Sequence, residues 1–322
     1  MKLKLQSFLA ALFFVFCGML AEAAAAPTPV DLLSAGRVDD AVRSLNVRVK
    51  DNPSDAEAYH LLSRAFFHLR KWDDAINYGE KAVQLNPSKA SYYMWLGRAY
   101  GEKADESSFI TAAGLTKKIR INFERAVELD GNSVEARTDL AEFYVEAPGF
   151  MGGGTDRAAE QARAIASLDA AKAHWISARI AEKKKDSAAA EREYMAAIKD
   201  SGDADYWLNL ASFYRRQNRY DDMENAVNKA LSSPMAKSNS LFDAATLLLR
   251  SGRNLSGAAN DVRKYLSLPT QNEEAPAFEA HYVLGQILEK QGDKAGAANE
   301  YRASLALAGD YKRAQEGLKR VS

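Results

Sequence analysis

Cysteine is almost absent from this 322-residue chain, which contains only Cys17. A single cysteine cannot form an internal disulfide, and it excludes a cysteine-rich metal site. An excess of one charge is also missing, because 43 lysines and arginines balance 43 aspartates and glutamates. A balanced chain has no global electrostatic attraction to nucleic acid or to an anionic membrane. We therefore expect neither kind of partner.

Proline is scarce as well, with eight residues in the whole chain, whereas apolar residues make up 47%. Alanine, leucine, glutamate, lysine and arginine are plentiful, and these residues favour helices. The composition therefore predicts a folded, largely helical chain that is long enough for a large core.

Motifs of catalytic and cofactor sites are missing too. The sequence has no H-E-x-x-H zinc motif and no G-x-S-x-G nucleophile elbow. GFMGGGTD (149–156) lacks the lysine of a phosphate-binding loop. DGNSVE (130–135) lacks the alternating oxygen ligands of a calcium loop. We interpret both stretches as turns between helices, and we expect no cofactor, no metal site and no catalysis.

The first residues are typical of a secretory signal peptide. Lys2 and Lys4 precede a 13-residue apolar run (8–20), and small residues follow in AEAAAA. The run is shorter than the roughly 20 residues that span a bilayer as a helix. We predict a signal peptide over 1–23, a mature chain that begins within 24–26, and no stable membrane insertion afterwards. An uncleaved anchor and lipidation of Cys17 are the alternatives.

A period of 34 residues organises the rest of the chain. YHLLSRAF (59–66), YMWLGRAY (93–100) and WLNLASFY (207–214) share an aromatic residue, leucine, a small residue and an aromatic residue at i, i+3, i+4 and i+7. This spacing places the four residues on one face of a helix. Pro53 and Pro87, 34 residues apart, each close a unit.

These residues resemble the tetratricopeptide repeat family, whose unit of about 34 residues is W-x2-L-G-x2-Y, A-x3-F and P. The resemblance implies an all-α, right-handed superhelical solenoid over 28–321, with about eight helix hairpins and a capping helix over 310–321. An irregular helical bundle is the alternative. The expected units start near Pro29, Asp55, Lys89, Ser133, Ala171, Asp203, Ser238 and Pro276.

Two neighbouring units, over 89–170, depart from the repeat. The third has ten extra residues within 101–120, which predicts longer helices or an extra turn at Gly114, and a hairpin that protrudes. In the fourth, Pro148 and the glycines of 149–154 end one helix and separate it from the next.

First helices line the concave groove in this family, and the repeat register places candidate binding residues there. Arg64, Arg98 and Arg179 fall at equivalent steps, and Phe67 and Trp175 would add apolar area. Arginine and tryptophan are frequent anchors of protein partners. Alternatively, the arginines pair with neighbouring acids such as Glu57 and Glu135. The lysine and asparagine clamp that some family members use for terminal carboxylates is not recognisable.

The leading functional hypothesis is an exported, periplasmic or secreted, bacterial scaffold that binds a protein or peptide in this groove. The alternative is a small-ligand-binding accessory subunit of an envelope transporter, which a deep cavity beside the third unit would favour. An enzyme is the third hypothesis, and it requires His60, His68 and carboxylates to meet in one pocket. The identity of the partner and the oligomeric state stay open.

Overall fold

The computed structural model describes residues 26–269 and 271–322, so the predicted signal peptide lies outside the described residues. These residues form seventeen α-helices and one short 3-10 helix, and no strand occurs among them. In chain order the elements are α1 (Pro29–Ser34), α2 (Val38–Asp51), α3 (Ala56–His68), α4 (Trp72–Leu85), α5 (Ala90–Asp105), α6 (Phe109–Leu129), α7 (Val134–Glu146), η1 (Gly149–Met151), α8 (Thr155–Ile165), α9 (Ala170–Lys183), α10 (Ser187–Ser201), α11 (Ala204–Arg216), α12 (Tyr220–Ser232), α13 (Ser238–Ser251), α14 (Leu255–Leu266), α15 (Ala277–Lys290), α16 (Lys294–Leu307) and α17 (Lys312–Val321).

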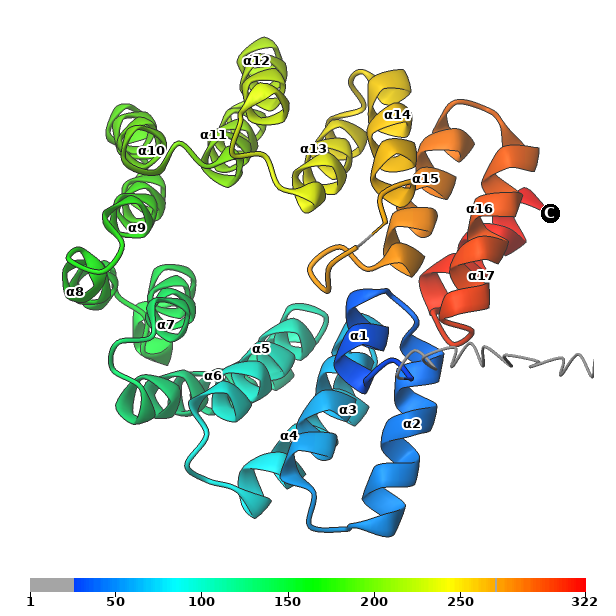
Figure 1. The fold of residues 1–322 in the computed structure, drawn as a ribbon. Coiled ribbons are helices and arrows are strands. Elements are labelled where there is room, and N and C mark those ends of the chain that lie inside the picture. Colours follow the sequence, from blue (N-terminus) through cyan, green and yellow to red (C-terminus); the bar gives the residue numbers. More distant parts are fainter. Residues whose placement is uncertain (1–25, 270) are drawn as a thin grey trace, which may run out of the picture.

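Consecutive helices pair as hairpins, from α1–α2 to α15–α16, and α17 follows the eighth pair. The odd-numbered first helices lie inside and the even-numbered second helices outside (Figure 1). The predicted all-α solenoid of about eight hairpins with a capping helix is confirmed. Asp55, Lys89 and Ser133, where we expected units to start, are the N-cap residues of α3, α5 and α7.

The small residue of the repeat lets the two helices of a unit approach closely. In the third unit, a Cβ on Gly97 would lie 2.6 Å from the ring of Phe123 in α6. In the second, the Ser63 hydroxyl donates to the carbonyl of Ala75 at 2.6 Å. Side chains larger than these would force the hairpins apart, and Ala75 and Ala82 on the facing helix are fully buried.

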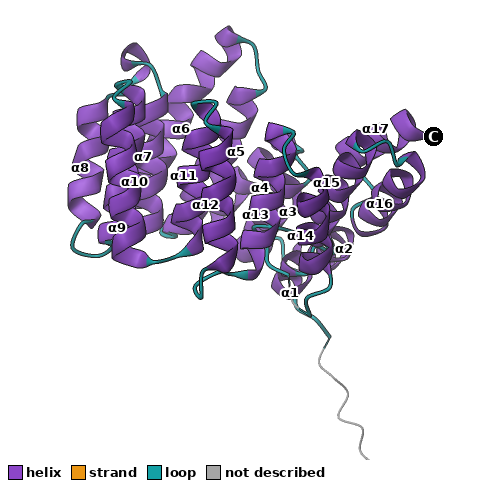
Figure 2. Cartoon of the chain, turned by 90° about the horizontal axis from the view of Figure 1, so that it is seen from above, coloured by secondary structure: helices purple, strands orange, loops and turns teal. Residues whose placement is uncertain are grey.

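The third unit has the long helices that its extra residues predict. α5 has 16 residues and α6 has 21, and the α6 helix continues through Gly114, so the extra turn at that glycine does not occur. Figure 2 shows this pair projecting beyond the neighbouring units. Phe109 and Ile110 at its tip are exposed.

The break in the fourth unit is a glycine-dependent turn, as expected. After η1, Gly152 has φ +94°, a left-handed conformation that favours glycine. The backbone also passes so close to Ala147 that a Cβ on Gly153 would lie 1.8 Å from the Ala147 carbonyl oxygen. The turn therefore has a structural reason for its glycines, with no phosphate needed to explain them.

The solenoid closes into a ring, which the repeat pattern does not predict. The eighth unit and α17 return to the first two units (Figure 1). Asp39 in α2 accepts a hydrogen bond from the Gly309 amide at 2.8 Å, and Lys71 Nζ lies 2.5 Å from Asp310 Oδ2. The expected open groove is thus the inner face of a closed ring.

A single glycine lets the short helix α1 enter the contact between the two ends. Gly36 has φ +68°, and a Cβ there would lie 2.3 Å from the backbone nitrogen of Ala277. Leu32 and Leu33 of α1 are buried beside it. The first unit therefore has an abbreviated first helix, and the turn that follows it packs against the start of α15.

No helix among the described residues is both long enough and apolar enough to cross a membrane.

Candidate functional site: the inner face of the ring

The first predicted anchor, Arg64, joins the two ends of the ring. Its guanidinium forms a two-pronged ion pair with Glu273, from the loop before α15, with Nε at 2.9 Å from Oε1. His68 Nε2 lies 2.9 Å from the same oxygen. Burial alone would raise the pKa of Glu273, but the hydrogen bonds from His68 and Arg64 lower it to about 2. Arg64 is therefore occupied by a contact within the chain.

Arg98 is paired in the same way, with acids of the next unit. Its Nε lies 2.7 Å from Asp139 Oδ2, and its Nη2 lies 2.8 Å from Glu135 Oε1. Burial disfavours the charged form of Arg98, but these carboxylates outweigh it and raise its pKa. The alternative that the arginines pair with neighbouring acids is thus confirmed for Arg98.

An aromatic residue that the register did not single out lies between these two arginines. The guanidinium carbons of Arg64 and Arg98 are each 5.1 Å from the ring centroid of Trp95. Phe67 is half-buried and packs edge-on against Trp95 and Trp72, with centroids 5.3 and 5.4 Å away. Stacked guanidinium and aromatic groups stabilise each other, so these side chains already have interaction partners within the chain.

Trp175 and Arg179 in α9 differ from the other predicted anchors. Trp175 is only 9% exposed, so the expectation that it offers broad apolar area to the groove is wrong. It is buried because α9 packs against the neighbouring first helix α7 and the second helices α8 and α10. Arg179 Nη2 lies 2.6 Å from Glu146 Oε1. Yet Trp175 Nε1 and Arg179 Nε are buried without a hydrogen-bond partner among the described residues.

The two histidines of the enzyme hypothesis lie on α3. His60 is 4% exposed and stacks on Tyr92 with ring centroids 4.6 Å apart. Burial lowers the pKa of His60 to about 4, so it is neutral at ordinary pH. His68 contacts Glu273 where the ring closes. The His68 contact therefore joins the two ends of the chain, whereas His60 packs against the neighbouring unit.

A pocket on the inner face lies between α11, α13 and α15, away from the stretch that holds Arg64 and Arg98. It has a volume of about 660 Å³ and is lined by both apolar and charged side chains. Apolar side chains include Leu208, Phe242 and Val283. Four carboxylates also line it, and they belong to Asp205, Asp243, Glu274 and Glu279. We call this site the acidic pocket.

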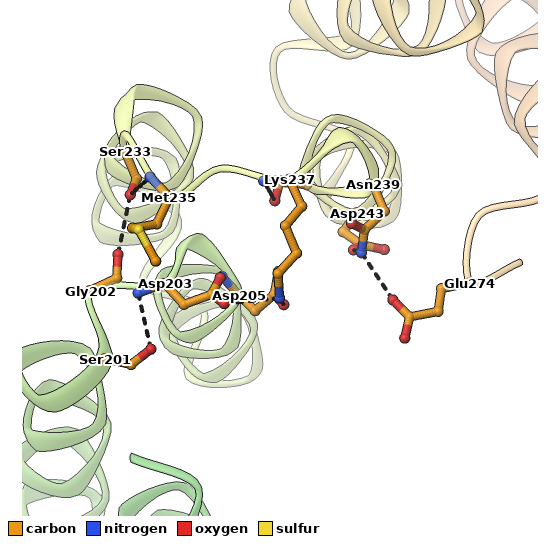
Figure 3. Close-up of polar contacts among 11 residues, drawn as sticks. Ser201, Gly202, Asp203, Asp205, Ser233, Met235, Lys237, Asn239, Asp243 and Glu274 are labelled. Atoms are coloured by element: carbon orange, nitrogen blue, oxygen red, sulfur yellow. Dashed lines mark hydrogen bonds and ion pairs between the residues drawn. The ribbon is translucent and has the colours of Figure 1, made fainter. Parts of the chain in front are cut away.

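Asn239 is the centre of the polar contacts in the acidic pocket (Figure 3). It is 4% exposed, and its Nδ2 lies 3.3 Å from both Asp243 Oδ2 and Glu274 Oε2. With the amide group turned to these two acceptors, Oδ1 has no partner among the described residues. Buried polar atoms normally have a hydrogen-bond partner, so this oxygen is an exception that needs an explanation.

Asp243 carries an unusual pKa. Burial, followed by the charges of Asp205 and Glu274, raises it to about 7, although the Asn239 hydrogen bond lowers it. Lys237 pairs with Asp205 of this pocket and with Asp203, at 2.8 and 2.9 Å, and it forms no ion pair with Asp243 or Glu274 among the described residues. The pocket therefore holds a carboxylate that titrates near neutral pH.

The sequence contained a signal for this pocket. Asn239, Asp243, Thr246 and Arg250 recur at i, i+4, i+7 and i+11, which is one polar face of α13. The seventh unit matches the repeat only in the spacing of its helices. The repeat motif therefore does not predict that this polar face lines the groove. Among the described residues, no cluster of three or more His, Cys, Asp or Glu side chains could hold a metal ion.

Sequence comparison identifies the repeats. Tetratricopeptide repeat models match residues 30–90, 204–233 and 242–316, together just over half of the chain. The chain therefore belongs to the tetratricopeptide repeat family. No curated protein matches the sequence.

Comparison with solved structures finds similarity at low sequence identity. Yeast Tom70 has 17% identity and a TM-score of 0.53, and the match covers 88% of this chain and 58% of the Tom70 chain. A thermophilic TPR protein of Thermus thermophilus has 21% identity and a TM-score of 0.48 over 57% of this chain and 94% of its own. A tetratricopeptide repeat protein of Parabacteroides merdae has 16% identity and a TM-score of 0.42 over 83% of this chain and 98% of its own. The chain thus spans little more than half the length of Tom70, and that likeness concerns the fold alone.

Proposed function

We propose that this chain is an exported, non-catalytic scaffold of the bacterial cell envelope that holds a polypeptide on the inner face of its ring. The order of charged, apolar and small residues in 1–23 supports export. Membership of a repeat family whose stacked units make extended concave surfaces supports protein binding.

One observation carries the proposal: several buried polar atoms of the first helices lack partners among the described residues. α9 provides two N–H donors of this kind, Trp175 Nε1 and Arg179 Nε. α11 and α13 provide two acceptors, Asp205 Oδ1 and Asn239 Oδ1. Leaving such atoms without hydrogen bonds costs free energy, and hydrogen bonds to a bound partner would recover it. A polypeptide backbone supplies both carbonyl acceptors and N–H donors, so it suits a surface that offers both.

Among the predicted anchors, the observed contacts favour Arg179 and Trp175 over the others. Arg64, Phe67 and Arg98 are engaged in contacts within the chain. We therefore place the bound segment toward α9, α11 and α13, in units five to seven, whereas the repeat register favours units two to five.

The acidic pocket also supports the alternative of a small-ligand-binding subunit. Its volume of about 660 Å³ is within the range of small-molecule sites. It lies between units six, seven and eight, however, and not beside the third unit, where that hypothesis expected a cavity. The experiment below separates the two functions.

The test is affinity capture from the envelope fraction with the full chain and two matched variants. Ser212→Trp fills the acidic pocket from α11, and Asn228→Trp places the same ring on the exposed face of α12 in the same unit. We expect a polypeptide that co-purifies with the wild type and with Asn228→Trp but not with Ser212→Trp. Equal capture by all three would place the partner elsewhere, and capture of no polypeptide would overturn the proposal.

Export has its own test. We predict that the exported protein begins within residues 24–26, where small residues precede a tolerated first residue. Intact-mass measurement decides this, because a mass that still includes Cys17 contradicts the proposed processing.

A further inference from the structure

The acidic pocket has acceptors where a bound group should place donors. Asn239 is only 4% exposed, and its Oδ1 has no hydrogen-bond partner among the described residues. Asp243 and Glu274 both lie 3.3 Å from the Asn239 amide nitrogen, which is their shared donor. One NH2 group facing two carboxylates leaves most of their acceptor capacity without a donor from the described residues, and Glu274 is exposed.

Charge is divided along the pocket. The helix face of α13 runs from Asn239 and Asp243 to Arg250, and α15 runs from Glu279 to Lys290. Asp243 and Arg250 are seven residues apart, which is about 10 Å along a helix. On these two helices a ligand would therefore meet acids at one end and bases at the other, while Arg313 of α17 also lines the pocket and lies near Glu279.

We propose that the acidic end of this pocket binds a primary ammonium or guanidinium group. The N–H groups of this cation would donate hydrogen bonds to Asn239 Oδ1 and to the carboxylates of Asp243 and Glu274. This proposal rests on the proposed function for the source of the group, a lysine or arginine side chain of the bound polypeptide. A free polyamine presents the same chemistry and is distinguished by the test.

Simpler explanations leave the central observation unaccounted for. Acids in the first turn of a helix complement its dipole, and that explains Asp205 and Glu279. It does not explain a buried amide oxygen without a donor. A metal ion is disfavoured, because the described residues hold no cluster of acids or histidines arranged to bind one. An anion would be repelled by the carboxylates.

The chemistry has a pH signature. Asp243, whose pKa is raised to about 7 by burial and by the charges of Asp205 and Glu274, must lose its proton to pair with a cation. Binding therefore weakens as the pH falls from 8 to 6, and it releases a proton. The charged groups that face Asp243 or line the same pocket are Asp205, Lys237, Arg250, Glu274, Glu279, Lys290 and Arg313.

The experiment follows the side-chain amide of Asn239 by NMR in the full chain. The probes are lysine with both backbone ends blocked, its norleucine analogue, and spermidine, each added to about 10 mM, a range that detects millimolar binding. Asp243→Asn and Glu274→Gln test the site. Asp261→Asn is the matched control, because Asp261 is a half-buried acid on the second helix of the same unit.

We expect a saturable shift with blocked lysine or spermidine and none with norleucine. Affinity should fall about tenfold in Asp243→Asn and Glu274→Gln and stay unchanged in Asp261→Asn. It should also fall about fivefold or more between pH 8 and pH 6 in the wild type but not in Asp243→Asn. No saturable shift with either cation, or equal shifts in all variants, would overturn the proposal.

The two proposals fail separately. A captured polypeptide that is lost in Asp243→Asn identifies the polypeptide as the source of the cation. Capture that survives Asp243→Asn but not Ser212→Trp leaves the scaffold function standing and overturns the lysine or arginine contact. Spermidine binding without any captured polypeptide leaves the cation site standing and overturns the scaffold function.

Discussion

The inner face has two regions built from the same kind of helix. In one region opposite charges are paired, and in the other carboxylates lie close together. In the stretch from α3 to α7, Arg64 and Arg98 each contact acids and flank the ring of Trp95. In the acidic pocket, Asp243 and Glu274 face each other across one amide. A charge at the right step of a repeat is therefore no evidence of a binding site until its partners are known.

The difference comes from which charges the stacking of units brings together. Arg98 meets Asp139 because first helices of successive units lie side by side, so opposite charges at neighbouring steps pair. At the acidic end of the pocket, Asp243 lies near the like charges of Asp205 and Glu274, and burial strengthens their repulsion. α9 lies between the two regions, with paired and unpaired polar atoms on the same side chain of Arg179.

The largest effect we predict comes from breaking a pair in the arginine region. Arg98→Met should lower the free energy of unfolding by about 3 kcal/mol, because it leaves the 11%-exposed side chain of Asp139 without its cation. Arg192→Met, at an exposed position of α10, should change it by less than about 0.5 kcal/mol. Urea unfolding followed by circular dichroism measures both, and equal midpoints would show that the Arg98 pair is not structural.

Two adjacent glutamates give a sharper comparison, because Glu273 belongs to the ring closure and Glu274 to the pocket. Glu273→Gln should destabilise the protein by about 2 kcal/mol at pH 7, while Glu274→Gln should cost less than about 0.5 kcal/mol. The pKa of Glu273 is lowered to about 2, so its contribution is present above about pH 4.5 and is lost as the pH falls toward 2. Unfolding at pH 7 and pH 3 tests this, and a constant difference between the wild type and Glu273→Gln would contradict it.

In the acidic pocket, removing a charge should stabilise the protein, whereas in the two cases above it destabilises the protein. The pKa of Asp243 is raised to about 7, so the wild type loses stability as the pH rises from about 4 to 7, where the folded state must give up a proton it prefers to keep. Asp243→Asn avoids this loss and should be more stable by at least about 1 kcal/mol at pH 8, with no gain at pH 4. A variant less stable than the wild type at pH 8 would show that the carboxylate has a stabilising partner.

The smallest effect concerns two hydroxyls. Thr246 Oγ1 is buried in the pocket region without a partner among the described residues, so Thr246→Val should stabilise the protein by about 0.5 kcal/mol. Ser63→Ala, which removes the donor to the Ala75 carbonyl, should instead destabilise it by about 1 kcal/mol. Thermal unfolding of both variants decides, and a loss of stability in Thr246→Val would mean that its hydroxyl is already satisfied.

Local pattern was enough to predict the repeat. The spacing i, i+3, i+4 and i+7 in 59–66 and 93–100 marks the buried face of a helix, and α3 and α5 bury Leu62 and Leu96 there. The extra residues of 101–120 likewise predicted the long α5–α6 pair. The register failed at Trp175, which we placed in the groove and which is buried. Its burial depends on neighbouring helices, and the pattern of one helix does not contain that information.

By itself the sequence determined the all-α repeat, the order of its hairpins and the residues that each hairpin buries, because these depend on contacts within a unit or between neighbours. Only the tertiary structure decided that the solenoid closes into a ring and which charges are satisfied. Arg64 and Glu273 are 209 residues apart, and the acidic pocket takes side chains from α11, α13 and α15. Such meetings result from small rotations summed over eight units, and no single repeat specifies where that sum returns.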